Sequence, residues 1–399
     1  MGNGENMSRF GLLITNPNHH WQMTGPIARE LKLLGHDPVL ISYSGLRRLR
    51  DKDEEYAELD LEVRKSPDLT RLGLASSAGQ ESLGDGQAKK RRFVQTLAWN
   101  MWLRHSLLPQ LRDITHLLVL NDQSFPLNFI VPHCLKRGKW VGLLQEGIRF
   151  PTPHEEGVSA YGRSGVKRFF TWGRSSQEYF QARIPGANGE IVVAGNPRYD
   201  EVLHVDQSSE VHELQNRLEL RKPLIGFASN PIDDLGFCTT EEKYELVRKF
   251  FADSLPVLKE TGGEMLVKLH PRESSAAFEA IIQQVGGAEH ISLFREQSVF
   301  LYLRAVERVV ILASTVGLEA LALERPVAVL PIGKHGHVHD YVSSGAALPI
   351  QLDHIGSQLK LWLSEDFGDS QRQYVADNIG SGRNSAAFIA KEMTSGHAG

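Results

Sequence analysis

The sequence LVKLHPR, residues 266–272, joins a short apolar run to a proline that ends it. Leu266 to His270 has the composition of a buried strand, and Pro271 ends it because proline cannot donate to a sheet ladder. His270 is therefore predicted at the carboxyl end of a strand. Ligands of open α/β sheets bind outside such ends, and an imidazole there can donate a hydrogen bond to a phosphate. Taken alone, a surface turn with an incidental histidine is the more common outcome.

A second stretch, VVILASTVGLEALALE, covers residues 309–324. VVILA is a continuous apolar run, as expected for a central strand of a parallel sheet. Ser314 and Thr315 follow it and are good N-caps for the helix that VGLEALAL predicts. A strand-to-helix turn of this kind can bind an anion through its N–H groups and hydroxyls, although a capped helix without a ligand fits equally well. Together, the two stretches predict adjacent strand ends that point at one phosphate-bearing ligand.

Composition limits the class of protein. The chain has 399 residues, of which 41% are hydrophobic and 23% charged, so we expect a soluble globular protein of two domains. Its net charge of −4 argues against a nucleic-acid binder. Cys134 and Cys238 are too far apart in sequence for a metal-ligand pair, which favours a reducing compartment. With no visible signal peptide and no apolar run long enough to span a membrane, the expected location is cytoplasmic.

Predicted strands and helices alternate along the chain in two series, which meet near residues 200–220. We expect an α/β protein with an N-terminal, acceptor-side Rossmann-like domain at residues 1–205. A nucleotide-donor Rossmann-like domain would follow at 206–380, and a C-terminal helix at 381–399 would pack back on the first domain. The chain has neither GxGxxG after its first strand nor GxxxxGK[ST], which disfavours nicotinamide binding and P-loop hydrolysis.

The N-terminal half contributes polar residues at predicted strand ends. A polar, turn-rich loop, NPNHHWQ at 16–22, follows the first strand and brings His19 and His20 to a carboxyl end. Glu146 follows the predicted strand WVGLL, where a carboxylate can act as a general base. The alternatives are a surface or packing role for the histidines and a solvated loop carboxylate. GNPRYD, residues 195–200, is dense in turn-forming residues.

Two further segments carry conspicuous charge or histidine. Lys89, Lys90, Arg91 and Arg92 form a basic cluster before an apolar helix that contains two tryptophans. That helix either packs into the N-terminal domain or, with the cluster, contacts a membrane surface or an anionic acceptor. GKHGHVHDY, residues 333–341, resembles a metal cluster at first sight. Because no carboxylate–histidine pattern surrounds it, a ligand or surface loop is favoured and no metal is expected.

Three motifs in order, QEG at 145–147, LHP at 269–271 and Ser314-Thr315, resemble those of bacterial GT-B transferases that use CMP-activated sugars. These are the sialyltransferases and the capsule Kdo-transferase-like enzymes. GNPRYD, LHP and STVGLEA also resemble motifs of CDP-glycerol glycerophosphotransferases. The resemblance spans residues 145–320 and implies a GT-B fold, two Rossmann-like domains facing each other across a cleft. Gln145 departs from the pattern, which more often has an acid there.

The resemblance implies a metal-independent, inverting glycosyltransferase without a cofactor. It would move a ulosonic acid, such as sialic acid or Kdo, from CMP to a hydroxyl of a glycan or glycolipid. Glu146 would be the general base, and His270 would contact the donor phosphate and help the nucleotide leave. The other residues assigned to the nucleotide and its phosphate are Lys268, Pro271, Ser314, Thr315 and Glu319. Candidate substrate contacts are Asn18, His19, Gln145, Gly147, Arg149, Asn196, Arg198, Ser229 and Asn230.

Other functions stay open on the sequence alone. They are a CDP-glycerol-type glycerophosphotransferase, a UDP-GlcNAc 2-epimerase-like isomerase, which shares the fold, and a non-catalytic nucleotide-sugar or glycan-binding protein. Peripheral contact with the inner face of the cell membrane would depend on the basic cluster at 89–92.

Overall fold

The computed structural model describes residues 8–47, 49–66, 101–147, 162–184, 189–203, 206–294, 298–380 and 384–395. The chain divides into two compact units. The first contains the described residues before 148, those from 162 to 201 and those from 378 on, and the second contains 202–377. The sequence prediction set these limits after residues 205 and 380.

Within the described residues, the first unit contains a seven-stranded parallel sheet in the order β3-β2-β1-β4-β5-β6-β7. Its central strands are apolar and buried, as expected where helices cover both faces of a parallel sheet. The strands are β1 (Phe10–Ile14), β2 (Val39–Ser42), β3 (Glu62–Lys65), β4 (His116–Val119), β5 (Trp140–Leu144), β6 (Arg168–Thr171) and β7 (Glu190–Val193).

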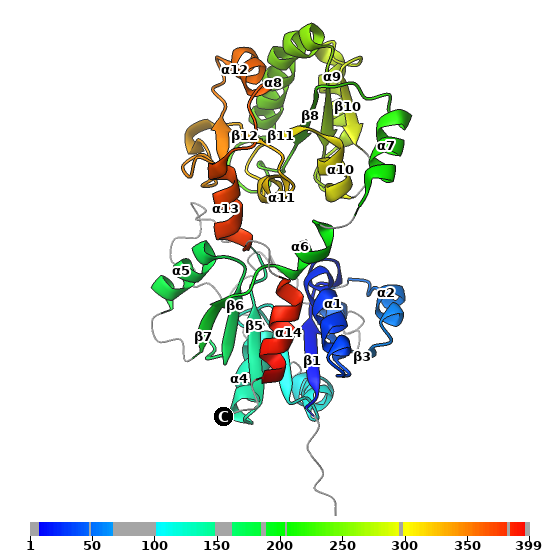
Figure 1. The fold of residues 1–399 in the computed structure, drawn as a ribbon, viewed down its shortest axis with the longest axis vertical. Helices are drawn as coiled ribbons and strands as arrows, with labels where there is room; N and C mark the ends of the chain where they lie inside the picture. Colours follow the sequence, from blue (N-terminus) through cyan, green and yellow to red (C-terminus); the bar gives the residue numbers. More distant parts are fainter. Residues whose placement is uncertain are drawn as a thin grey trace, which may run out of the picture. The chain divides into compact units, whose positions relative to one another are not determined.

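Helices and short helical turns flank this sheet. The C-terminal helix α14 (Ser385–Ser395) packs against α1 (Pro17–Leu33), so the end of the chain belongs to the first unit (Figure 1). A buried core joins alternate strand residues, among them Leu13, Ile41 and Leu117, to the short helical segments before β4. The other elements are η1 (Ser44–Arg47), α2 (Asp53–Glu58), η3 (Leu103–Leu107), η4 (Leu108–Leu111), α4 (Leu127–Lys136), α5 (Arg174–Arg183) and α6 (Pro197–Val202).

The second unit contains, within the described residues, a six-stranded parallel sheet in the order β10-β9-β8-β11-β12-β13. Ala228 pairs with Lys268 on one side and Ile311 on the other, so β8, β9 and β11 end level with one another. The strands are β8 (Leu224–Ala228), β9 (Glu264–Lys268), β10 (Ile291–Phe294), β11 (Arg308–Ile311), β12 (Val327–Val329) and β13 (Ala347–Pro349).

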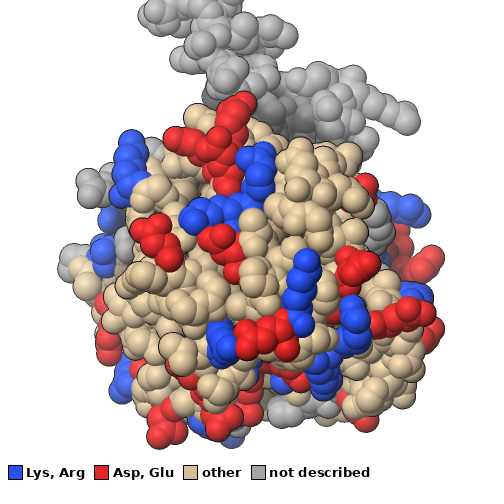
Figure 2. Space-filling view, turned by 90° about the horizontal axis from the view of Figure 1, so that it is seen from above, with Lys and Arg blue, Asp and Glu red and all other residues tan. Residues whose placement is uncertain are grey.

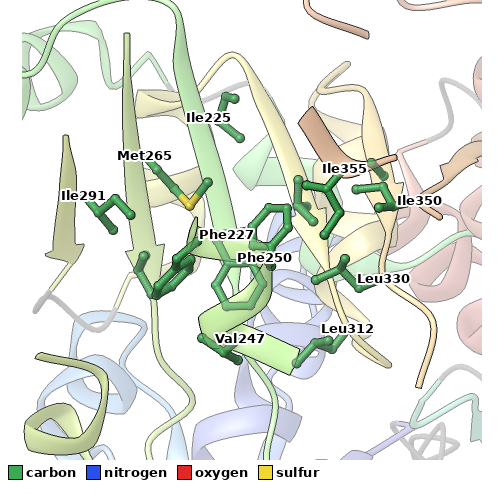
Figure 3. Packing of buried hydrophobic residues seen from close by; sticks show 14 of the residues in the cluster. Ile225, Phe227, Val247, Phe250, Met265, Ile291, Leu312, Leu330, Ile350 and Ile355 are labelled. Carbon is green, nitrogen blue, oxygen red and sulfur yellow. The ribbon is translucent and has the colours of Figure 1, made fainter. Parts of the chain in front are cut away.

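One hydrophobic cluster unites the second sheet with the helices on one of its faces (Figure 3). Phe227 of β8 stacks on Phe250 of α8 with ring centroids 5.3 Å apart. Helix α8 begins with a capping box, in which the side chains of Thr239 and Glu242 each bond the other's backbone N–H. The helical elements are α7 (Ser208–Arg217), α8 (Thr240–Thr261), α9 (Ser275–Gln284), α10 (Val299–Ala305), α11 (Val316–Ala322), η5 (Gly333–His335), α12 (Ile355–Trp362) and α13 (Asp369–Ile379).

Candidate functional site

Polar residues of the first unit gather where β1, β4 and β5 end. These strands are neighbours in the parallel sheet. From β1, strands β2 and β3 are added on one side and β4 to β7 on the other, so the strand order changes sides between β1 and β4. Open α/β sheets bind ligands at such a switch point. Asn121 follows β4 and Glu146 follows β5, while α1 begins directly after β1. The sheet therefore brings three segments that are distant in sequence to one edge.

The predicted loop NPNHHWQ is mostly helical, which corrects the sequence interpretation. Helix α1 begins at Pro17, because a proline fits the first helical position and the Asn16 side chain accepts a hydrogen bond from the His19 N–H. The first turn places His19 and His20 toward the strand ends, and His20 is buried. Asn18 is exposed.

The carboxylate of Glu146 is the centre of this arrangement, which we call the Glu146 cluster. It receives hydrogen bonds from Nε2 of His20 and from Nδ2 of Asn121, both at 2.9 Å. The backbone carbonyl of Glu146 lies 2.7 Å from Nε2 of His19. The cluster thus consists of His19, His20, Asn121 and Glu146. Sequence reasoning placed His20 beside His19 at the end of the first strand, but it did not single out Asn121.

The hydrogen bonds define the tautomers of both histidines. The backbone N–H of Thr15 donates to Nδ1 of His20 at 3.2 Å, so that nitrogen carries no proton and Nε2–H donates to Glu146. In His19, Nε2–H donates to the Glu146 carbonyl, which leaves Nδ1 as an acceptor in the neutral ring. Burial lowers the pKa of His19, which favours this neutral form.

Glu146 is held in its ionised form. Burial by itself raises the pKa of this carboxyl, but His20 and Asn121 outweigh burial and lower the pKa to about 2. A carboxylate with this pKa accepts a proton less readily than one whose pKa lies near neutrality.

The segment GNPRYD joins the same edge of the first unit. It was predicted as a series of turns, but from Pro197 it forms α6. Asn196 is buried, and its side-chain oxygen accepts a hydrogen bond from the Arg198 N–H at 3.0 Å. After burial, the charge of Arg198 is among the effects that lower the pKa of His19. An anionic substrate group would find its counter-charge here.

Gln145 has a structural role. Its side chain is fully buried, accepts a hydrogen bond from the Trp172 N–H at 2.8 Å, and donates to Ser176 at 2.9 Å and to the Gly147 carbonyl at 3.0 Å. These bonds join the ends of β5 and β6. The departure from an acid at this position is explained, because a carboxylate cannot donate to Ser176 and the carbonyl.

The second unit separates two strand ends that the sequence interpretation took as adjacent. Strand β8 lies between β9 and β11, so the ends of β9 and β11 stand about 10 Å apart at the usual strand spacing. The hydrogen bonds we find for the His270 backbone and ring and for the Ser314 side chain stay within their own turns. A phosphate contacted by both residues would have to bridge the end of β8.

Glu273 orders the turn that carries His270, and sequence reasoning missed it. One carboxylate oxygen accepts from the His270 N–H at 2.9 Å, and the other accepts from the Ser229 hydroxyl at 2.8 Å. The second oxygen also lies 3.2 Å from the ammonium of Lys243, which pairs with Asp233 at 2.8 Å. This buried network fixes the loops after β8 and β9. In the sequence, the one indication of this role was that Glu273 stands three residues after His270.

Ser314 and Thr315 behave differently from one another. Ser314 is buried, and its hydroxyl accepts from the Val316 N–H at 3.3 Å. Thr315 is the N-cap residue of α11, but it has helical φ and ψ of −69° and −14° and makes no side-chain cap bond. Its side chain is exposed. The Thr315 hydroxyl is therefore exposed, while Ser314 shapes the turn.

The remaining assigned residues of this unit surround the same edge. Lys268 ends β9 half-buried, with its ammonium 5.3 Å from the ring centroid of Phe294, and burial lowers its pKa. Pro271 lies in the turn after His270. Glu319 is buried in the first turn of α11. Asn230 donates to the Ala313 carbonyl, so it supports the turn before Ser314.

The histidine-rich loop supports the Ser314 turn from the other side. The Tyr341 hydroxyl donates to the Ser314 carbonyl at 3.3 Å and accepts from the Leu318 N–H at 3.1 Å. His339 lies half-buried beside Ala313, and the burial of its ring lowers its pKa to about 4. Among the described residues, no group of three or more histidine, cysteine or acidic side chains is arranged to hold a metal ion.

Some predictions lie outside the described residues. These are the substrate contact Arg149 and the membrane contact through Lys89, Lys90, Arg91 and Arg92. In the part of the chain that the structure describes, no helix has the length and apolar character needed to cross a membrane.

Two comparisons place this fold among known proteins. Residues 237–334 match a family model described as capsule polysaccharide biosynthesis protein. The match covers less than half of the chain and includes His270, Ser314 and Thr315. No curated protein sequence matches the chain.

Solved structures resemble the whole chain. The UDP-GlcNAc 2-epimerase of Neisseria meningitidis, solved with UDP-GlcNAc bound, has a TM-score of 0.66 at 11% identity, covering 97% of this chain and 99% of that one. The epimerase of Methanocaldococcus jannaschii has a TM-score of 0.62 at 12% identity, covering 97% and 99%. A glycosyltransferase of Rickettsia africae has a TM-score of 0.55 at 10% identity, covering 98% and 99%. The chain thus has the two-Rossmann, GT-B type of fold.

Proposed function

We propose that this protein is a glycosyltransferase of capsule-type polysaccharide synthesis that uses a CMP-activated ulosonic acid, such as sialic acid or Kdo. The observation that carries the proposal is the Glu146 cluster at the switch point of the first sheet. An ionised carboxylate held by His20 and Asn121 suits the removal of a proton from an acceptor hydroxyl. The capsule family match supports the same class and includes the turns proposed for the donor.

In this mechanism, the acceptor hydroxyl loses its proton to the carboxylate of Glu146, which His20 and Asn121 hold in place. The acceptor oxygen then attacks the anomeric carbon of the donor. The bond from that carbon to the CMP phosphate oxygen breaks, and CMP leaves with the bonding electrons. Its phosphate gathers negative charge, which His270, Lys268 and the Thr315 hydroxyl would stabilise. Arg198 would pair with the substrate carboxylate. Direct displacement inverts the anomeric centre, and no step in it calls for a metal ion.

The direct test is nucleotide release from CMP-Kdo, CMP-sialic acid, CDP-glycerol and UDP-GlcNAc, each with and without a glycan acceptor. We expect CMP release that depends on the acceptor, with inverted linkage in the product by NMR. Release of CMP with the anomeric configuration retained would contradict the proposed displacement. If CDP-glycerol were the one donor used, the protein would be a glycerophosphotransferase rather than a sugar transferase. Binding of nucleotide sugars without turnover of any would identify a binding protein instead.

A second candidate is a UDP-GlcNAc 2-epimerase-like isomerase. It is favoured by the resemblance of nearly the whole chain to epimerases, one of them solved with UDP-GlcNAc bound. The same panel separates the two functions. Conversion of UDP-GlcNAc to UDP-ManNAc without an acceptor, together with no reaction of the CMP sugars, would establish the isomerase.

A further inference from the structure

A pocket of about 480 Å³ opens on the first unit at the amino-terminal end of its sheet. Among the described residues that line it, none is acidic, and the non-basic ones are leucines and a proline. We call it the basic pocket, after the five side chains Arg104, Arg112, His133, Arg137 and Lys139. By contrast, acidic and basic side chains are interspersed on the face drawn in Figure 2.

The five basic residues come from four places in the fold. Arg104 belongs to η3, Arg112 follows η4, His133 and Arg137 lie at the end of α4, and Lys139 directly precedes β5. A favourable interaction with the α4 dipole explains His133 and Arg137, but it does not explain the residues that other elements contribute. Their convergence is therefore a property of the fold rather than of one helix.

Local contacts hold these groups in place without neutralising them. Nη1 of Arg137 lies 2.9 Å from Nδ1 of His133, and Nζ of Lys139 donates to the backbone carbonyls of Arg112 and Ile114. Burial, reinforced by the neighbouring cations, lowers the pKa of His133. Burial and Arg137 also lower the pKa of Lys139, against an opposing effect of Asp113. An anion bound among these like charges would reduce their mutual electrostatic repulsion.

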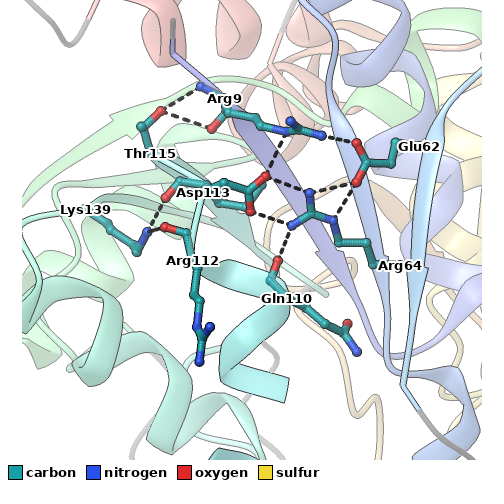
Figure 4. Close-up of polar contacts among 9 residues, drawn as sticks. Arg9, Glu62, Arg64, Gln110, Arg112, Asp113, Thr115 and Lys139 are labelled. Carbon is teal, nitrogen blue, oxygen red and sulfur yellow. Dashed lines mark hydrogen bonds and ion pairs between the residues drawn. The ribbon is translucent and has the colours of Figure 1, made fainter. Parts of the chain in front are cut away.

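The nearby carboxylate, Asp113, is already engaged. Both of its oxygens pair with Arg64 at 2.7 Å, and Arg9 lies 3.2 Å away. Figure 4 shows the guanidinium of Arg112 pointing away from this ion-pair cluster. The Arg112 charge is therefore directed elsewhere, and Asp113 is not left to offset the basic pocket.

We propose that the basic pocket binds a phosphoryl-bearing anion, either free in solution or as the head group of an anionic lipid. The site is separate from the Glu146 cluster, because Lys139 precedes β5 and Glu146 follows it, so the length of the strand lies between them. Phe129, which is 48% exposed, lies one turn before His133 on the same face of α4 and provides an apolar flank for a lipid. The proposal does not depend on the glycosyltransferase activity.

The test uses the full-length protein and two probes. Inorganic pyrophosphate is titrated by calorimetry, and vesicles of equal parts phosphatidylcholine and phosphatidylglycerol are used in sedimentation, with pure phosphatidylcholine vesicles as the blank. The test variant carries R104Q, R112Q and R137Q, three exposed positions. The matched control carries R163Q, R183Q and K391Q, which remove the same charge from exposed positions elsewhere on this unit.

We expect the wild-type protein to bind at least one probe. The test variant should bind it on the order of a hundredfold more weakly, because each charge removed should lower the affinity roughly fivefold. The control should bind as the wild type does, and R112Q alone should weaken binding about fivefold. Binding of pyrophosphate without vesicles assigns a free anion, and binding of vesicles assigns a lipid head group. No binding of either probe, binding that R104Q/R112Q/R137Q leaves unchanged, or equal losses in both triple variants would overturn the proposal.

Discussion

Nε2 of His20 lies 2.9 Å from Oε1 of Glu146, although 126 positions separate the two residues in the chain. The contact joins the first turn of α1 to the end of β5 and makes Glu146 part of an ordered cluster. A surface carboxylate would need none of these partners.

The Glu146 cluster makes stability depend on pH. The pKa of Glu146 falls from an ordinary 4.5 to about 2 in the folded protein, so its interactions stabilise the fold above pH 4.5. This contribution is lost as pH falls from 4.5 toward 2. Urea unfolding of the wild type and Glu146→Gln should therefore show a stability difference at pH 6 that shrinks at pH 3. A difference that stays constant over this range would contradict the assigned pKa.

Glu273 should be important for the stability of the second unit. Glu273→Gln removes a charge from the buried network with Lys243 and weakens the turn at His270, so we expect a loss of about 3 kcal/mol in urea unfolding. Glu260→Gln is the matched control, because Glu260 pairs with Lys360 on the surface, and it should cost less than about 1 kcal/mol. Equal effects of the two changes would refute the structural role of Glu273.

Gly317 allows α11 to pack closely on Ile311 of β11 and on the Tyr341 ring. A Cβ at this position would lie 2.7 Å from Ile311 and 2.9 Å from the Tyr341 ring. Gly317→Ala should therefore destabilise the protein by about 1–3 kcal/mol, measured by thermal unfolding. The control is Gly368→Ala, whose Cβ would meet only Gln371 at 3.9 Å. Unchanged stability of Gly317→Ala would show that the ring can move aside.

The two hydroxyls of the Ser-Thr pair should separate binding from stability. Thr315→Val keeps the shape of the side chain and removes an exposed hydroxyl, so nucleotide binding should weaken about tenfold while the melting temperature stays the same. Ser314→Ala removes the bond from the Val316 N–H and should lower the melting temperature as well. Thermal-shift titration with CMP measures both quantities. Loss of CMP binding in Ser314→Ala alone would reverse the assigned roles.

Much of the fold was predictable because its signals are local. The apolar runs at β8, β9 and β11 and the capping box of Thr239 and Glu242 depend on residues close in sequence. The start of α1 was missed because NPNHHWQ was taken as a polar loop, whereas Asn16 and Pro17 form an N-cap and a first helical residue.

The missed part of the site depends on pairs that no local pattern reveals. Asn121 bonds to Glu146 from a neighbouring strand, and Glu273 bonds to Ser229 across two loops. The placement of β8 between β9 and β11 follows from strand order, which short motifs do not encode. Sequence therefore indicated which edges carry the chemistry, and the fold determined which side chains meet there.

Acceptor-dependent turnover by Glu146→Gln tests the central claim most directly. The variant keeps the size of the side chain and removes its charge, so turnover should fall by about 10²–10⁴-fold. Its melting temperature should stay well above the temperature of the activity assay. Glu178→Gln, an exposed position on α5, is the matched control and should turn over as the wild type does. Wild-type turnover by a folded Glu146→Gln protein would contradict the account.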